Sequence, residues 1–203
     1  MNKTSGNFTN NTKSDILIIA REIMYKDGYE KLSMRKIASR LGFTATSLYY
    51  HFKNKEELVL ELVHESRLRM AQFINNRLKK LSNPIEIVIE SFVSYIDYGL
   101  QNPEDYKIMF MLPYPGILSD RLKAIVTDKI EPGILDLAKR IEEINPEHKN
   151  NSVDLAHALW MMSHGYISTI ITSREDIVYN QESVYKYILK IIKLVITSPF
   201  NKK

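Results

Sequence analysis

Hydroxyl, phenol and basic side chains are concentrated between residues 33 and 58, in the segment SMRKIASRLGFTATSLYYHFKNKEEL. Side chains of these types donate hydrogen bonds to phosphate oxygens and to the edges of bases. If the second half of the segment is helical, its outer side carries Thr46, Tyr50 and Lys53, flanked by Ala45, Tyr49 and His51. This side therefore suits contact with a nucleic-acid backbone.

Two short helices joined by a tight turn would position these side chains. Ser33 is suited to cap the first helix, because its hydroxyl can accept the Lys36 amide. Gly42 would end that helix in the left-handed conformation that a sharp reversal needs, and Thr44 would cap the next helix by accepting the Ser47 amide. The apolar residues expected beneath both helices are Ile37, Ala38, Leu41, Leu48 and Phe52. The pattern predicts a helix-turn-helix, whose second helix offers its first residues to base edges in the major groove.

The order of a basic helix, L-G-F, T-x-x-S-L-Y-Y-H-F and K-N-K-E-E-L resembles the DNA-binding domain of the TetR family of bacterial transcriptional repressors. The likeness covers roughly Thr12 to Leu62, about a quarter of the chain. It implies that Arg35 and residues 44–47 approach bases, and that residues 49–51 and Lys55 hold phosphates. The candidate DNA-binding residues are therefore Ser33, Arg35, Thr44, Ala45, Thr46, Ser47, Tyr49, Tyr50, His51 and Lys55. Since Ala45 and Thr46 have little hydrogen-bonding capacity, we expect operator specificity to depend on thymine methyl groups, Arg35 and DNA shape.

Composition narrows the class of protein. The chain has 203 residues, a net charge of +4 and no cysteine, which excludes disulfides, thiolate metal sites and thiol redox sensing. A charge this mild would need basic residues gathered on one surface to bind nucleic acid. The polar N-terminus and the lack of a long apolar run predict neither a signal peptide nor a membrane span, and a cytoplasmic location.

Apolar spacing predicts an all-α fold with a small head and a larger body. We expect a disordered N-terminal arm over residues 1–12, a helix-turn-helix DNA-binding domain over 13–54, and a helical ligand-binding and dimerisation domain over 55–203. The body should open with one helix over 55–81 and include others from Pro84 and from Pro103. A turn is expected at 113–116, a helix over 120–144 that Pro132 and Gly133 kink or split, and a loop over 145–151. The last two helices are expected over 152–172 and 181–197.

These last two helices are apolar on several sides, which exceeds what the core of one small monomer can use. The pattern favours a homodimer in which they pair with their copies in a four-helix bundle, and the likeness to TetR proteins implies the same. Two subunits would also present two recognition helices to a palindromic operator. The alternative is a monomer with a large core.

A small-molecule site is expected in the body, where large apolar and aromatic residues cluster. Methionine and tyrosine suit an apolar or aromatic ligand with a few polar handles, although the same residues would serve a dry core. The candidate ligand-binding residues are Phe92, Tyr95, Tyr98, Met109, Phe110, Trp160, Met161 and His164. The sequence W-x-x-x-H-G at 160–165 resembles a signature in the ligand-binding domain of one TetR subgroup; the alternative for His164 is a core histidine bonded to a backbone carbonyl.

Metal and enzymatic functions are not supported by the sequence. His157 and His164 are seven residues apart on one helix, about 10 Å at ~1.5 Å per residue, which is too far for one ion. Glu86, Glu90 and Asp97 follow helical spacing and are interpreted as a solvated face. No Gly-rich phosphate loop, H-E-x-x-H or nucleophile elbow is present, so we expect no enzyme, metal or cofactor.

The sequence therefore predicts a homodimeric DNA-binding transcriptional regulator that a small apolar or aromatic effector releases from its operator. The alternative is a helical DNA-binding module regulated by a protein partner. Both have double-stranded DNA as a partner, and they differ in what binds the body.

Overall fold

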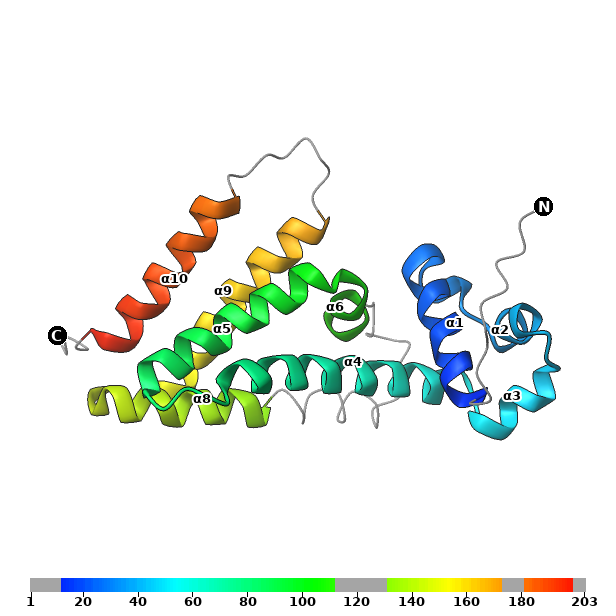
Figure 1. Cartoon of the computed structure of the whole chain (residues 1–203), viewed down its shortest axis with the longest axis horizontal. Coiled ribbons are helices and arrows are strands. Elements are labelled where there is room, and N and C mark those ends of the chain that lie inside the picture. The colour runs from blue at the N-terminus through cyan, green and yellow to red at the C-terminus, as the bar shows by residue number, and fades with distance from the viewer. Residues whose placement is uncertain (1–11, 112–130, 173–180, 199–203) are drawn as a thin grey trace. The chain divides into compact units, whose positions relative to one another are not determined.

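The computed structural model of the chain describes residues 12–111, 131–172 and 181–198, and all the regular structure within them is helical (Figure 1). The helices are α1 (Thr12–Asp27), η1 (Tyr29–Lys31), α2 (Met34–Leu41), α3 (Ala45–His51), α4 (Lys55–Leu78), α5 (Pro84–Gln101), α6 (Pro103–Phe110), α8 (Glu131–Ile144), η2 (Pro146–His148), α9 (Ser152–Thr172) and α10 (Gln181–Thr197). The predicted all-α fold is confirmed. The described helices divide into two compact units, the first holding residues up to Leu68 together with those from Glu104 to 111, and the second holding the others.

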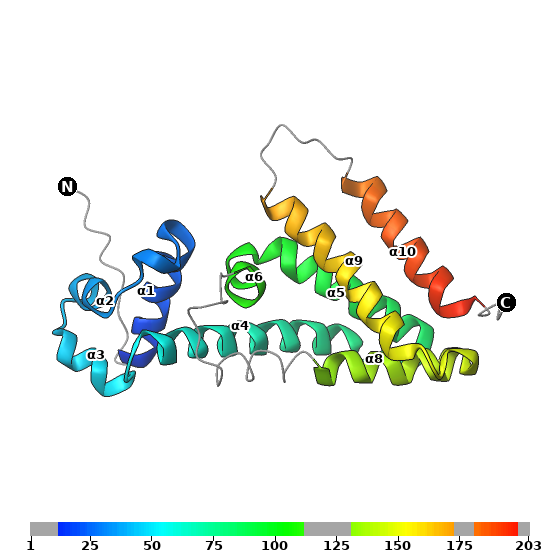
Figure 2. The ribbon, with the colours of Figure 1, turned by 180° about the vertical axis from the view of Figure 1, so that it is seen from behind.

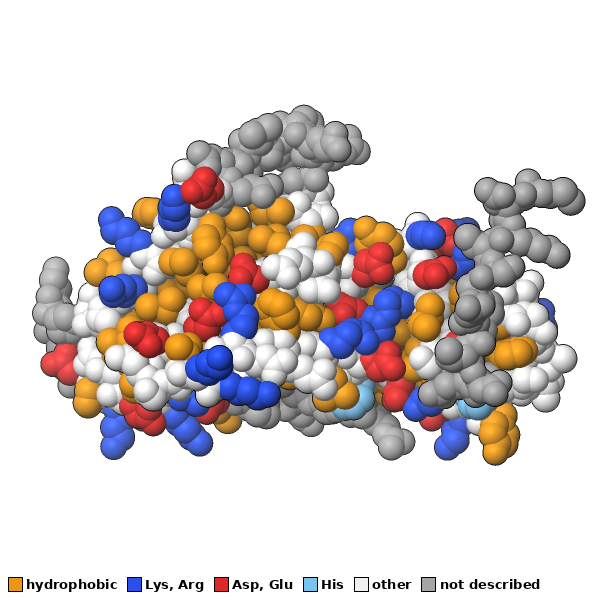
Figure 3. Space-filling view, in the orientation of Figure 1, with side chains coloured by type: hydrophobic (Ala, Val, Ile, Leu, Met, Phe, Trp, Pro, Cys, Tyr) orange, Lys and Arg blue, Asp and Glu red, His pale blue; other side chains and the backbone are white. Residues whose placement is uncertain are grey.

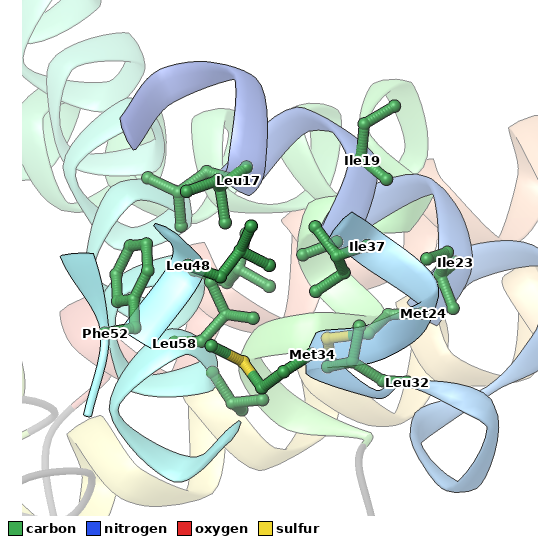
Figure 4. Close-up of a cluster of buried hydrophobic side chains, with 14 of the residues drawn as sticks. Leu17, Ile19, Ile23, Met24, Leu32, Met34, Ile37, Leu48, Phe52 and Leu58 are labelled. Carbon is green, nitrogen blue, oxygen red and sulfur yellow. The ribbon is translucent and has the colours of Figure 1, made fainter. Parts of the chain in front are cut away.

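The first unit is built on an apolar cluster beneath α1, α2, α3 and the start of α4 (Figure 4). Leu48 and Phe52, one turn apart, both point into this cluster, and neither is more than 2 % exposed. Ile37 of α2 and Leu17 of α1 complete the contact between these helices. Ile108 of α6, although distant in sequence, belongs to the same cluster. Burial of one stripe from each helix therefore leaves the opposite side of α3 exposed.

The helix ends of the first unit form as the local sequence predicts. The Ser33 hydroxyl accepts the Lys36 amide at 3.2 Å, and the Thr44 hydroxyl accepts the Ser47 amide at 3.2 Å. Gly42 has φ of 72°, the left-handed conformation that a residue with a Cβ adopts at a cost, and its N–H donates to the Ala38 carbonyl. These three interactions hold α2 and α3 on either side of a short turn.

A variant of the predicted capping box begins α4, in which Glu57 accepts the amide of Lys53 instead of that of Asn54. The Asn54 side chain accepts the Glu57 amide at 2.8 Å, and the Glu57 carboxylate accepts the Lys53 amide at 2.6 Å. The helix was predicted to reach residue 81 and ends at Leu78, where the Leu81 amide turns back to the Leu78 carbonyl. Because α4 passes Leu68, its two ends belong to different units.

The second unit packs α5, α8, α9 and α10 around apolar side chains. α9 contacts both α5 and α8, and α10 contacts α5, α9 and α8 (Figure 2). The core of this unit includes Val88, Phe92, Ile96, Ile141, Leu159, Ile167 and Ile192. Asn83 caps α5 by accepting the amides of Ile85 and Glu86.

Two segments of the second unit bear on the prediction from sequence. α8 is described from Glu131, so the kink or split predicted at Pro132 and Gly133 is not tested, because the residues before it lie outside the described part of the chain. The expected loop over 145–151 contains a short 3-10 helix, η2, whose start is capped by Asn145. Residues 1–11 of the arm predicted over 1–12, the turn predicted at 113–116, and residues 120–130 of the helix predicted over 120–144 lie outside the described residues. No helix in the described part of the chain is both long and apolar enough to cross a membrane.

Candidate nucleic-acid interface

The outer side of α3 carries the side chains that were predicted to reach DNA. Tyr50 is 89 % exposed and Tyr49 is 51 % exposed, and Thr46 is exposed as well. The Tyr50 ring meets the half-buried His51 ring edge to face, with the ring centres 5.4 Å apart. Since the apolar side of α3 is sealed in the core, these exposed groups are available for an external ligand.

The hydroxyls of Thr44 and Ser47 bond to each other at 2.9 Å at the start of α3. Thr44 Oγ1 also accepts the Ser47 amide, so both side chains are held against the helix end. Ala45, half-buried between them in sequence, adds only a methyl group. The hydroxyls of Thr44 and Ser47 are thus engaged at the helix end, whereas the exposed hydroxyl of Thr46 takes no part in capping.

Basic side chains around the turn fall into two groups. Lys36 pairs with Asp27 at 2.5 Å, and Arg40 pairs with Glu22 at 3.3 Å, so α1 balances the charge on one side of α2. The hydrogen bond from Lys36 is the main reason that the pKa of Asp27 is lowered. Within the described residues, no acidic partner meets the exposed side chains of Arg35 and Lys53. These two are therefore the cations best placed to neutralise phosphates.

Lys55 makes an interaction that the sequence did not suggest. Its Nζ donates to the Tyr29 carbonyl at 2.7 Å and lies 3.6 Å from the centre of the Tyr29 ring. Burial is the main cause of the lowered pKa of Lys55, and the nearby charge of Glu30 opposes that shift. The ammonium of Lys55 thus anchors α4 to η1, and its contact with phosphate stays a prediction.

Residues 16–62 match the family described as bacterial regulatory proteins, tetR family. The matched residues run from α1 to the first two turns of α4, so they include the whole helix-turn-helix and its exposed face. This chain is a TetR-type DNA-binding transcriptional regulator. The comparison confirms that part of the prediction, and the described N-terminal helices form its TetR-type head.

Solved structures extend the likeness to the whole fold of the TetR-type chain. A bacterial regulatory protein in the tetR family from Rhodococcus RHA1 is 16 % identical, with a TM-score of 0.68 over 95 % of this chain and 100 % of that one. A transcriptional regulator from Saccharomonospora viridis, solved in complex with choline, is 17 % identical, with a TM-score of 0.71 over 91 % and 97 %. AibR, solved with isovaleryl coenzyme A and operator DNA, is 18 % identical, with a TM-score of 0.68 over 93 % and 99 %. At these identities the likeness establishes the fold.

The predicted ligand-binding residues of this TetR-type protein are divided between its two units. Phe92, Tyr95 and Tyr98 of α5 are buried in the second unit, which also holds residues 160–164 of α9. Met109, which is buried, and Phe110, which is half-buried, lie on α6 in the first unit. No single unit holds all eight residues.

On α9 the Trp160 and His164 rings stack, with their centres 5.2 Å apart and their planes 21° from parallel. Both residues are half-buried, whereas Met161 is 58 % exposed. Burial lowers the pKa of His164, so its imidazole is neutral at pH 7 and can both donate and accept a hydrogen bond. The likeness of this segment to the W-x-x-x-H-G subgroup stays a prediction, as does its role in binding.

Sequence reasoning missed the charged residues that join helices inside each unit. Glu90 and Asp97 were interpreted as a solvated face, but both bind Arg77, at 2.6 and 2.5 Å. In the first unit, Arg21 of α1 pairs with Asp105 of α6. No local pattern identifies either cluster, because the partners are between 13 and 84 residues apart in sequence.

Proposed function

We propose that this protein is a homodimeric repressor that leaves its operator when a small apolar or aromatic molecule binds the helical body. The exposed side of α3 carries the DNA-binding half of the proposal. Residues that were expected to read or grip DNA are exposed there, on a helix whose other side is sealed in the core. A basic pair at Arg35 and Lys53 supplies charge for phosphates.

Apolar side chains on the last two helices support the dimer. Tyr187 and Leu194 of α10 are 64 % and 60 % exposed and, at seven residues apart, share one side of the helix. Met161 of α9 is 58 % exposed. Hydrophobic side chains gather on the surface of the second unit (Figure 3). Covering such a surface with a second copy removes it from water, and two-fold symmetry sets two recognition helices on a palindrome.

The effector is the less constrained half of the proposal. The half-buried Trp160 and the neutral His164 offer an aromatic surface and a group that both donates and accepts. Regulators of similar fold were solved with isovaleryl coenzyme A and with choline, two chemically different molecules, so the fold does not define the ligand. We propose that the ligand changes the disposition of α4, and thereby the spacing of the two heads. A coupling of ~1–3 kcal/mol would lower operator occupancy substantially.

The DNA-binding half is tested with a duplex selected by the wild-type protein from a random pool. In fluorescence anisotropy, Tyr50→Ala and Lys53→Gln should each weaken binding about tenfold, and Lys53→Gln should reduce the slope of log K against log salt by ~0.9 per lost contact. Lys139→Gln, an exposed lysine of α8, is the matched control and should change neither quantity. Unchanged affinity in both head variants would remove the assignment of α3.

The effector half is tested by a thermal-shift screen followed by DNA release. A ligand at 100 times its dissociation constant should stabilise the fold by ~2.7 kcal/mol and displace the selected duplex. If no small molecule displaces the duplex but a protein captured by the full chain does, regulation by a protein partner would replace the small-molecule effector in the proposal.

A further inference from the structure

One arginine joins three helices of the first unit. Arg21 of α1 pairs through Nη1 with the Asp105 carboxylate of α6, and through Nη2 with Glu65 of α4 at 3.0 Å. The Ser66 hydroxyl of α4 donates to Asp105 Oδ1 at 3.0 Å and accepts from Arg21 Nη1 at 3.3 Å. The guanidinium therefore contacts α6 through Nη1 alone, and α4 through both Nη1 and Nη2. We call these four residues the Arg21 cluster.

The α6 side of the Arg21 cluster is the buried side. Asp105 is 6 % exposed and Ser66 is fully buried, whereas about a third of the Glu65 side chain is exposed. A buried carboxylate is strongly unfavourable unless a cation and hydrogen bonds compensate it. Asp105 has both, but only while α6 stays at this distance and angle from α1. Directional contacts of this kind define a position more narrowly than apolar contacts, which tolerate sliding.

α6 has two further contacts with the same unit. Ile108 is buried in the apolar cluster, and Lys107 Nζ lies 5.5 Å from the centre of the Tyr25 ring of α1. α6 starts at Pro103, and one residue, the C-cap Asn102, separates it from α5, so the chain passes from the second unit into α6 with almost no linker. A movement of α5 would thus be delivered to Asp105 within a few residues.

We propose that Arg21 and Asp105 are positioning residues for DNA binding: α6 orients α1 through their ion pair, and α1 in turn orients α2 and α3. α1 packs on α2, and α2 packs on α3, so a change in the position of α1 can reach α3 through these contacts. Neither residue lies on α2 or α3, and both are engaged with each other, so the effect does not require contact with DNA. The inference rests on the proposed function, and it names the charge through which α6 controls the head.

The decisive variant is Asp105→Asn, which keeps the size and the oxygen acceptor of the side chain and removes its charge. Glu65→Gln is the matched control, because it removes a charge from the same guanidinium on the α4 side only. Binding of the duplex selected with the wild-type protein is measured well below the unfolding temperature of each variant. Asp105→Asn should weaken binding about tenfold, within the usual range of coupling between sites. Glu65→Gln should stay within about twofold of the wild type.

Two further measurements separate positioning from other roles. The slope of log K against log salt should not change in Asp105→Asn or Arg21→Met, since no phosphate contact is lost. The double variant Arg21→Met with Asp105→Asn should bind no more weakly than Arg21→Met alone, because the two residues act as one pair.

The outcomes are distinguishable. Asp105→Asn that unfolds more easily but binds DNA like the wild type would reduce the pair to a structural role and overturn the inference, with the proposed function intact. A reduced salt slope in Arg21→Met would make Arg21 a phosphate ligand, which also overturns it. A wild-type protein that selects no duplex would remove the proposed function and this inference together.

Discussion

Each unit contains an arginine that pairs with two carboxylates on neighbouring helices, but the surroundings of the two clusters differ. Arg21 of α1 pairs with carboxylates of α4 and α6, whereas both partners of Arg77 of α4 lie on α5. In the first unit, Arg21 meets Asp105, which is almost completely buried. In the second unit, Arg77 meets Glu90 and Asp97, whose side chains are each about a quarter exposed. Charge attraction is similar in both clusters, whereas the desolvation of the carboxylates is not. Breaking the first cluster strands a buried charge, and breaking the second returns charges to water.

The difference indicates where the molecule can rearrange. We call Arg77, Glu90 and Asp97 the Arg77 cluster. Tyr185 of α10 lies near this cluster, and its pKa is raised mainly by burial and next by the negative charge of Asp97. Groups that retain access to water change partners at a lower cost than groups sealed from it. We therefore expect the second unit to adapt to ligands while the first unit moves as a block.

The largest expected effect tests this difference directly. Arg21→Met should lower the free energy of unfolding by about 3–5 kcal/mol, because it leaves Asp105 buried without its cation. Arg77→Met, the matched change in the second unit, should cost only about 0.2–1 kcal/mol, since its partners keep partial access to water. Denaturant titrations followed by circular dichroism measure both. Equal losses would show that burial does not distinguish the two clusters.

Two leucines, one buried in the first unit and one exposed in the second, offer a second comparison. Leu48→Ala in α3 should cost about 2–5 kcal/mol and abolish duplex binding, because the side chain is fully buried. Leu194→Ala in α10 should change the unfolding free energy of the dilute monomer by less than about 0.5 kcal/mol, since the leucine is 60 % exposed.

The same Leu194→Ala variant sharpens the dimer proposal when protein concentration is varied. In sedimentation equilibrium its dissociation constant should rise several-fold over that of the wild type. Identical dimer affinity in the two proteins would place this side of α10 outside the interface.

Two glycines are expected to respond in opposite directions to the same substitution. Gly42→Ala should destabilise the head by about 1 kcal/mol, because φ of 72° is unfavourable for alanine. Gly165→Ala should stabilise the second unit by about 0.5–1 kcal/mol, since the glycine is inside α9 and an added Cβ meets no atom within 4 Å. Thermal unfolding measures both changes. A loss at Gly165 would point to a close approach by a ligand or a second copy.

The smallest expected effect is a pH dependence in the second unit. The folded pKa of His164 is lowered by burial, so the unfolded chain takes up the proton first as the pH falls. The stability contribution of the neutral ring is complete above the ordinary histidine pKa of ~6.5 and is lost as the pH falls from there through the folded pKa. Denaturant titrations at pH 7.5 and 5.5 should show a larger loss in the wild type than in His164→Gln. The same substitution at His157 of α9 controls for the change of residue type, and equal losses in all three proteins would contradict the prediction.

Local rules predicted the head well. The caps at Ser33 and Thr44, the glycine turn and the Asn54 cap before α4 all involve residues within four positions of one another, and each formed as expected. The start of α9 and the end of α10 were also predicted, because apolar spacing within one helix is visible in the sequence.

Lys55 shows where local rules stop. Its type and place at the start of α4 suggested a phosphate contact, but the hydrogen bond that it makes reaches Tyr29, 26 residues earlier. A side chain with several rotatable bonds can satisfy its charge with any acceptor that the fold brings near, and the sequence does not show which one that is.

The sequence by itself determined that the chain is helical, where the head turns, and which side of α3 is left exposed, because these depend on hydrogen bonds and apolar spacing between near neighbours. Only the tertiary structure decided that α6 belongs with the head and that Arg21 and Asp105 meet across 84 residues. Ion pairs between helices have no sequence period. Their partners are selected by the packing of the whole unit and by the free-energy cost of leaving a buried charge alone.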